Sequence, residues 1–207
     1  MTQEDHNPPD SDRHQEKMAR KKAARDRLMA SKEGDKPLLI VTTGTGKGKT
    51  TAALGMIVRC LGHGMKVGVV QFIKGAWDTA ERRFFEALPG DLITFHALGE
   101  GFSWETQDQA RDTAAAERAW TAAKEMLADP AFAMIVLDEI NVAIRNGQLD
   151  EQVVIDAIAH RPHRQHVVMT GRGASERLIE AADLVTEMKL LKHPFRGGVK
   201  GQPGVEF

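Results

Sequence analysis

The sequence predicts an α/β protein of three layers, with a mostly parallel sheet of about six strands and helices on both faces. Short apolar runs alternate along the chain with stretches of helical periodicity. The runs are apolar at consecutive positions, as is typical of strands buried on both faces. A glycine-rich loop ending in Lys-Thr joins the first apolar run to the first helical stretch. Together these observations favour a P-loop NTPase-like (RecA-like) fold.

Each element follows from a local pattern. The β-type runs predict strands at 38–42, 67–73, 92–96, 132–137, 166–170 and about 184–190. The helical stretches predict helices at 50–62, 106–128 and 174–182 and near 79–88 and 150–160. In the first helix Leu54, Ile57, Val58 and Leu61 recur at i, i+3, i+4 and i+7, which places them on one face.

The first 36 residues form a separate extension, and residues 37–207 form the main domain. The extension is dense in charges of both signs, so we expect the first dozen residues to be disordered. From about Arg13 to Ser31 the pattern predicts a basic helix with few apolar anchors. Two interpretations stay open: a solvated helix, or a segment that folds over a ligand or partner.

The net charge of the chain indicates which kinds of partner it is unsuited to bind. Lys and Arg total 28 against 29 Asp and Glu, a net charge of −1, so no overall field attracts nucleic acid or a membrane surface. Cys60 is the single cysteine, which excludes an intramolecular disulfide and suits a reducing compartment. The sequence has neither a long apolar run nor a hydrophobic N-terminal segment. We therefore expect a cytoplasmic protein.

The loop after the first strand predicts a nucleotide triphosphate site. Its glycines allow backbone N–H groups to turn around phosphate oxygens, while Lys49 supplies a charge and Thr50 a hydroxyl for Mg²⁺ or Mn²⁺. A threonine, Thr43, stands where the usual spacing has the first glycine. The predicted binding residues are Gly44, Thr45, Gly46, Lys47, Gly48, Lys49, Thr50 and Thr51.

Polar residues at the ends of later strands extend this site. Asp138 and Glu139 end a buried apolar run and are expected to hold the metal, since Mg²⁺ prefers carboxylate oxygens. In a hydrolase, Glu139 would instead act as base for a water molecule. Arg172 follows another strand, either to grip phosphate or a carboxylate or as an ordinary surface arginine in a turn.

Two segments are not expected in a general nucleotide hydrolase. Phe102 and Trp104 lie in a glycine-rich loop, either as the wall of an apolar ligand pocket or folded back on the sheet. The tail from Lys192 to Gly204 is rich in glycine and cations, and either lines an acidic ligand or is mobile.

With these motifs the chain resembles ATP:corrinoid adenosyltransferases of the phosphate-loop type, the cob(I)alamin and cob(I)yrinic acid a,c-diamide adenosyltransferases. The resemblance covers about residues 37–207 in collinear order. It is carried by Thr43 to Thr51, Val67 to Gly75, Gly99 to Gln107, Leu137 to Glu139, Thr170 to Gly173 and the Lys-His-Pro-Phe tail.

The resemblance implies transfer of the 5′-deoxyadenosyl group of ATP to Co(I) of a corrinoid, with release of triphosphate, in adenosylcobalamin biosynthesis. It implies catalytic roles for Lys49, Phe102, Trp104 and Arg172, with Thr50, Asp138 and Glu139 as metal ligands. It also implies a homodimer, no permanently bound cofactor, and an electron donor such as a reduced flavin or flavoprotein. By resemblance, the N-terminal helix closes over the corrinoid.

Two other functions share the predicted fold. A RecA-like NTPase acting on nucleic acid would use the same loop, but the main domain has no basic stripe. A small-molecule kinase would use it as well. The product separates the three, because adenosyl transfer releases triphosphate whereas hydrolysis and phosphoryl transfer release ADP.

Overall fold

The computed structural model describes residues 10–32, 34–73, 79–99 and 108–205. Internal contacts divide the chain into two units, Met1–Asp35 and Lys36–Phe207. The first unit contains α1 (Asp10–Ala30), which begins three residues before the predicted helix. Its large apolar side chains, Met18, Leu28 and Met29, are each at least half exposed.

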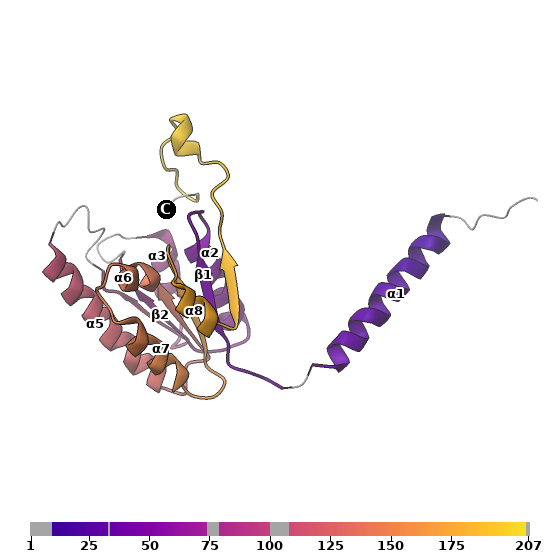
Figure 1. The fold of residues 1–207 in the computed structure, drawn as a ribbon, viewed down its shortest axis with the longest axis horizontal. Coiled ribbons are helices and arrows are strands. Elements are labelled where there is room, and N and C mark those ends of the chain that lie inside the picture. Colours follow the sequence, from indigo (N-terminus) through magenta and orange to yellow (C-terminus); the bar gives the residue numbers. More distant parts are fainter. Residues whose placement is uncertain (1–9, 33, 74–78, 100–107, 206–207) are drawn as a thin grey trace, which may run out of the picture. The chain divides into compact units, whose positions relative to one another are not determined.

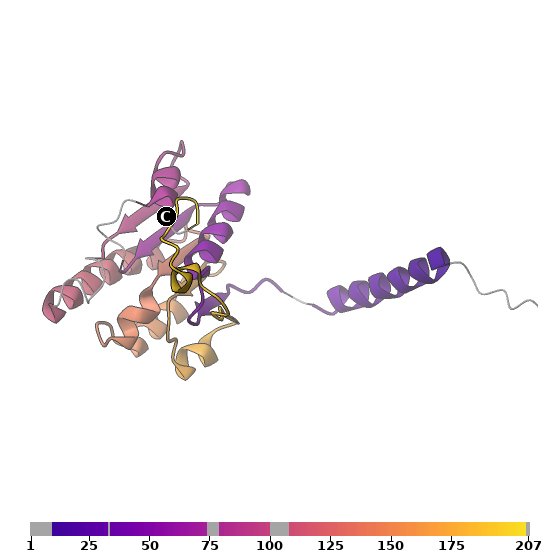
Figure 2. The same cartoon turned by 90° about the horizontal axis from the view of Figure 1, so that it is seen from above.

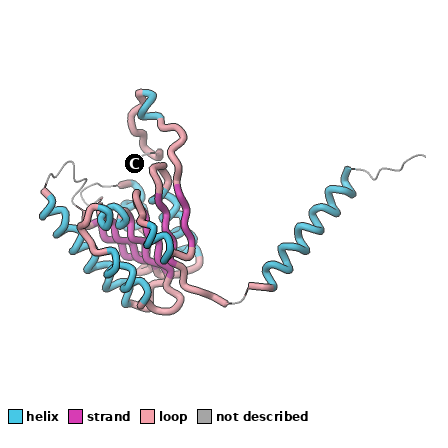
Figure 3. Tube along the Cα trace, viewed as in Figure 1, coloured by secondary structure: helices cyan, strands magenta, loops and turns pink. Residues whose placement is uncertain are grey.

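The second unit alternates strands with helices, as Figure 3 shows. The strands are β1 (Leu39–Thr43), β2 (Val67–Gln71), β3 (Ile93–Ala97), β4 (Met134–Asp138), β5 (His166–Thr170) and β6 (Leu184–Glu187). The helices are α2 (Lys49–Gly62), α3 (Ala80–Glu86), α5 (Gln109–Ala128), α6 (Ile140–Arg145), α7 (Glu151–Ala159), α8 (Glu176–Ala181) and the 3₁₀ helix η1 (Pro194–Gly197). Among the helices of the described residues, none has the length and apolar character needed to cross a bilayer.

The six strands form one sheet in the order β3-β2-β4-β5-β1-β6, and every neighbouring pair is parallel (Figure 1). The predicted α/β class and sheet are therefore confirmed. In a parallel sheet all carboxyl ends lie along one edge, so the turns after β1, β4 and β5 meet there. The strand β5 separates β1 from β4.

Alternate residues of each central strand enter opposite cores. Leu39 and Val41 pack with α5, α6, α7 and α8, whereas Ile40 packs on the other face with α2 and α3. Figure 2 shows helices on both sides of the sheet. Because both faces are covered, consecutive strand residues must be apolar, which explains the continuous apolar runs.

Three elements differ from the sequence prediction. The short helices α6 and η1 were not predicted, because six and four residues are too few for a clear helical period. The last strand was predicted to be apolar and buried up to residue 190, but β6 ends at Glu187 and is exposed throughout. The reason is its place at the edge of the sheet, where it pairs only with β1.

Polar contacts anchor the start of β1. Asp183 accepts hydrogen bonds from the Lys36 ammonium group and from the Leu39 amide, the latter at 2.8 Å. Arg161 Nη2 donates to the Pro37 carbonyl at 2.8 Å. Burial raises the pKa of Asp183, but the hydrogen bonds from Lys36 and Leu39 and the charges of Lys36 and Arg161 outweigh it and hold that pKa below its ordinary value.

Candidate active site

The predicted phosphate-loop motif, Thr43 to Thr51, runs from the last residue of β1 into the first turn of α2. Gly44 (φ 97°) and Gly48 (φ 101°) adopt left-handed conformations that suit glycine. Lys49 opens α2, and its Nζ donates to the Gly46 carbonyl at 2.6 Å. The Lys49 side chain is thus held inside the loop, with the residue only 6% exposed. A buried ammonium group and a helix N-terminus make this end of β1 suited to an anion.

Thr43 has a structural reason to replace the usual glycine. Its Oγ1 accepts a hydrogen bond from the Ala174 amide at 3.2 Å, and its carbonyl accepts one from the Met188 amide at 2.8 Å. The side chain therefore ties the turn after β5 to the phosphate loop, a bond that glycine has no atoms to make.

The segment after β6 forms one wall of the loop. The Gly46 amide donates to the Met188 carbonyl at 2.6 Å. A Cβ at Gly44 would lie 2.5 Å from that carbonyl oxygen, and a Cβ at Gly46 would lie 2.7 Å from it. Both contacts are far too short for carbon and oxygen, so this close approach of two backbones requires glycine at both positions.

A row of polar side chains crosses the sheet at the carboxyl ends of four adjacent strands. Gln71, Asp138 and Thr170 end β2, β4 and β5, and Thr42 is the last residue but one of β1; we call these four residues the polar row. Two residues before each of them, the strand carries a residue of the core that contains α2. Because side chains alternate between the two faces of a strand, all four side chains lie on the same face of the sheet as α2. All four are buried, and Asp138 and Thr170 have no exposed surface.

Asp138 is the acceptor at the centre of the row. Its Oδ1 accepts from Thr50 Oγ1 at 2.8 Å and from Thr170 Oγ1 at 2.7 Å. Its Oδ2 accepts from Gln71 Nε2 at 2.9 Å. Three donors therefore compensate for removing this carboxylate from water. The sequence analysis did not predict a role in the site for Gln71 or Thr170. The one feature that could have indicated it is that each of them is a polar residue at the end of an apolar run.

Glu139 follows Asp138 with a left-handed backbone, φ 63° and ψ 17°, and precedes α6. Its amide donates to Thr170 Oγ1 at 2.9 Å, and its side chain is partly exposed. Arg172 is exposed on the turn after β5, between Gly171 (φ 129°) and Gly173 (φ 74°). The structure thus brings Thr50, Asp138, Glu139 and the Arg172 turn to the carboxyl edge beside the phosphate loop.

Two other predicted segments remain, the aromatic loop and the C-terminal tail. Phe102 and Trp104 lie outside the described residues. In the tail, η1 is exposed, and its N-cap His193 accepts a hydrogen bond from the Phe195 amide at 3.2 Å. The Phe195 side chain is 73% exposed, so it is not part of the core.

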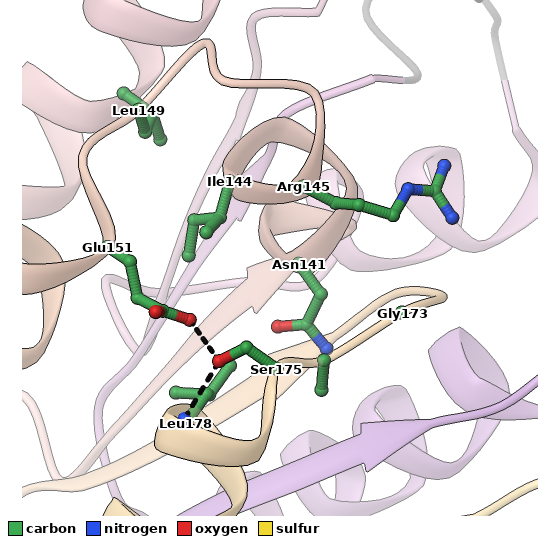
Figure 4. A pocket seen from close by; sticks show the side chains of 9 residues that line it. Asn141, Ile144, Arg145, Leu149, Glu151, Gly173, Ser175 and Leu178 are labelled. Carbon is green, nitrogen blue, oxygen red and sulfur yellow. Dashed lines mark hydrogen bonds between the residues drawn. The ribbon is translucent and has the colours of Figure 1, made fainter.

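A cavity of about 270 Å³ lies between α6 and the starts of α7 and α8 (Figure 4). Ile144, Leu149 and Leu178 contribute apolar walls. Asn141, Arg145, Glu151 and Ser175 contribute polar groups. Ser175 and Glu151 are hydrogen-bonded to each other, and Ser175 Oγ also accepts from the Leu178 amide at 3.0 Å. No residue predicted for the nucleotide site lines this cavity, although Gly173 and Ala174 of the turn after β5 do.

A glycine-rich anion loop at the carboxyl edge of an all-parallel sheet, next to a buried acid bonded to the loop's threonine, defines a protein of P-loop NTPase-like fold. The chain belongs to the family described as ATP:corrinoid adenosyltransferase BtuR/CobO/CobP, which matches residues 35–207. Residues 1–28 match a second family, described as Cob(I)alamin adenosyltransferase N terminal.

Three curated relatives, each named corrinoid adenosyltransferase, match nearly the whole chain. The protein of Sinorhizobium sp is 57% identical over 96% of this chain and 93% of its own length. That of Pseudomonas aeruginosa is 53% identical over 97% of this chain and 98% of its own. That of Escherichia coli is 42% identical over 95% of this chain and 98% of its own. The family predicted from the motifs is therefore confirmed.

Proposed function

We infer that this chain is a transferase that moves the 5′-deoxyadenosyl group of ATP to the Co(I) centre of a corrinoid, in cobalamin biosynthesis. Family membership over residues 35–207 supports the reaction. The structural observation that supports the proposal is the hydrogen bond from Thr50 to Asp138, next to the buried Lys49. This bond links the predicted phosphate loop to the first residue of the acidic pair Asp138-Glu139.

The reaction requires one substitution at carbon. Co(I) donates an electron pair to C5′ of the ribose, a cobalt–carbon bond forms, and the C5′–O bond breaks with its electron pair leaving on triphosphate. Water takes no part, so Glu139 is not needed as a base. Lys49 and the loop amides stabilise the charge that develops on the departing triphosphate. We propose the same task for Arg172, whose guanidinium suits phosphate oxygens.

The oxygen groups beside the loop fit Mg²⁺ or Mn²⁺. Thr50 supplies a hydroxyl and Glu139 a carboxylate, both hard ligands of the kind these ions take alongside phosphate. Asp138, also predicted as a ligand, is fully buried, and its oxygens already accept from three donors. We propose that Asp138 acts through Thr50, holding its hydroxyl hydrogen so that its lone pairs face the ion. When bound, the ion would offset the charge of the triphosphate.

The corrinoid side of the site rests on the resemblance. We propose that Phe102 and Trp104 take the lower face of the corrin and displace its axial base. Loss of that donor lowers the energy of the cobalt dz² orbital, so a reduced flavin or flavoprotein becomes able to convert Co(II) to Co(I).

We also propose a homodimer in which α1 of one subunit closes over the corrinoid. Met18, Leu28 and Met29 are exposed on α1, and a corrin offers an apolar surface for them to cover. The match of residues 1–28 to the adenosyltransferase N-terminal family supports a role for this segment in the reaction. The reduced cobalt and the single buried cysteine favour the cytoplasm as the compartment.

The deciding experiment is incubation of the full chain with Mg-ATP and a pre-reduced corrinoid. The corrinoid spectrum reports formation of the cobalt–carbon bond, and phosphate analysis identifies the inorganic product. We expect adenosylated corrinoid and triphosphate in equal amounts. Release of ADP without change in the corrinoid spectrum would instead identify a hydrolase or a kinase.

A further inference from the structure

We propose that Thr170 is a positioning residue that fixes both acids of the site through one hydroxyl group. The proposal rests on the function above to the extent that it assumes a divalent cation and triphosphate bound beside Thr50 and Glu139. Thr170 has no exposed surface, so it would act only through its neighbours.

The geometry of the hydroxyl is the starting point. Thr170 Oγ1 donates its single hydrogen to Asp138 Oδ1 at 2.7 Å and accepts from the Glu139 amide at 2.9 Å. It therefore binds the side chain of one acid and the backbone of the next. Thr170 has no exposed surface and ends β5, which is paired on both sides. Its position is thus set by the sheet and not by solvent.

The first consequence concerns Thr50. Asp138 Oδ1 accepts from both Thr170 and Thr50, and the second bond turns the Thr50 hydrogen away from the proposed metal. Loss of the Thr170 hydroxyl would remove one of the two donors to Asp138 Oδ1, so that the Asp138 carboxylate could rotate towards other donors. Gln71 would then be the remaining row residue bonded to the carboxylate. Thr170 therefore maintains the orientation of Thr50 indirectly.

The second consequence concerns Glu139. A residue other than glycine at φ 63° is held in an unfavourable conformation, which persists only when its surroundings determine it. The bond from the Glu139 amide to Thr170 is one such determinant. The Glu139 carbonyl, in turn, accepts from the Val142 amide at 3.1 Å at the start of α6. Thr170 thus sets the backbone from which the Glu139 carboxylate extends.

The sheet supplies a matched control. Thr42 is aligned with Thr170 in the β1–β5 register, lies in the same row and is also buried. Its hydroxyl makes no hydrogen bond with any residue in the described part of the chain. Thr42→Val and Thr170→Val therefore exchange the same hydroxyl for the same methyl in equivalent strand positions. Only the second exchange removes bonds to the acids.

The test measures binding of Mn²⁺ to the full chain in the presence of tripolyphosphate, followed by the electron paramagnetic resonance signal of free Mn²⁺. For Thr170→Val we expect the Mn²⁺ dissociation constant to rise about 10- to 100-fold, the usual effect of losing a group that orients metal ligands. Thr170→Ser, which keeps the hydroxyl, is expected to bind nearly as wild type. Thr42→Val is expected to do the same.

Several outcomes would overturn the inference. They are unchanged Mn²⁺ binding by Thr170→Val, an equal loss in Thr42→Val, or failure of Thr170→Ser to restore binding. Thermal unfolding of each variant shows whether it is folded, and the smaller Thr170→Ala replaces Thr170→Val if the valine variant does not fold. No corrinoid or turnover enters this assay. Absence of adenosyl transfer alongside the expected Mn²⁺ pattern would therefore contradict the proposed function alone.

Discussion

Gly46→Ala tests how closely the phosphate loop is packed. A methyl group at this position would meet the Met188 carbonyl oxygen at 2.7 Å, and ordinary contact begins near 3.4 Å. The atoms it meets belong to the backbone, so the loop and the 188–189 segment must separate by about 0.7 Å. The bond from the Gly46 amide to Met188, now 2.6 Å, would lengthen to about 3.3 Å, beyond the usual range.

The magnitude follows from two contributions. Overpacking of a closely fitted site costs about 1–3 kcal/mol, and the weakened hydrogen bond about 1 kcal/mol more. For a protein of this size each kcal/mol lowers Tm by about 2–4 °C, so we expect a fall of about 4–16 °C. Since displacement of about 1 Å in a site can reduce turnover about 100-fold, kcat/KM for ATP should fall by about one to two orders of magnitude.

The assay pairs thermal unfolding with adenosyl transfer, and Gly55→Ala is the control. Gly55 is exposed within α2, and an added Cβ there meets no atom within 4 Å. Alanine favours the helix over glycine by about 0.8–1.0 kcal/mol, so this control should be neutral or slightly stabilising, with normal kinetics. A Gly46→Ala protein with wild-type Tm and wild-type kcat/KM would refute the reasoning.

Three further predictions concern the loop, the corrinoid side and acid stability. Lys49→Ala should abolish transfer from both Co(I) and Co(II) substrates, because the charge that stabilises triphosphate is lost; normal turnover would exclude the loop from the mechanism. Trp104→Ala should leave ATP binding nearly intact and reduce transfer from Co(II) far more than from pre-reduced Co(I), and equal losses would contradict redox tuning. The lowered pKa of Asp183 means that its stabilisation is fully present above the unfolded-state pKa of about 3.9 and is lost as pH falls through the lower folded value. Asp183→Asn should therefore lower Tm at pH 7, with a difference that shrinks towards pH 3; a constant difference across that range would count against it.

Contiguous patterns allowed much of the fold to be predicted. Leu54, Ile57, Val58 and Leu61 were predicted to share one face of α2, and Ile57 is indeed fully buried against the sheet. Val58 is 54% exposed, a correction to that pattern, because the buried face is centred on Ala53, Ile57 and Cys60. The strands β1, β2, β4 and β5 each carry consecutive apolar residues before a polar carboxyl end, because both of their faces are covered. The exposed edge strand β6 was misjudged because its position in the sheet depends on pairing with β1, 140 residues or so earlier in the chain.

The candidate site was predictable only in part for the same reason. The loop from Gly44 to Thr51 and the pair Asp138-Glu139 are short runs whose chemistry is readable from the residues themselves. The roles of Gln71 and Thr170 are not, because each bonds Asp138 across a sequence separation of 67 and 32 residues respectively. Only the register of the strands brings them together.

The sequence by itself predicted the α/β class, a phosphate-loop motif and the adenosyltransferase family, since local periodicity and short motifs carry that information. The tertiary structure decided which groups restrain the acids and why the loop is irregular. Thr43 bonds the turn after β5, and Met188 lies so close to Gly44 and Gly46 that no side chain fits. These facts depend on parallel pairing of distant strands, which aligns their carboxyl ends and which no single segment specifies.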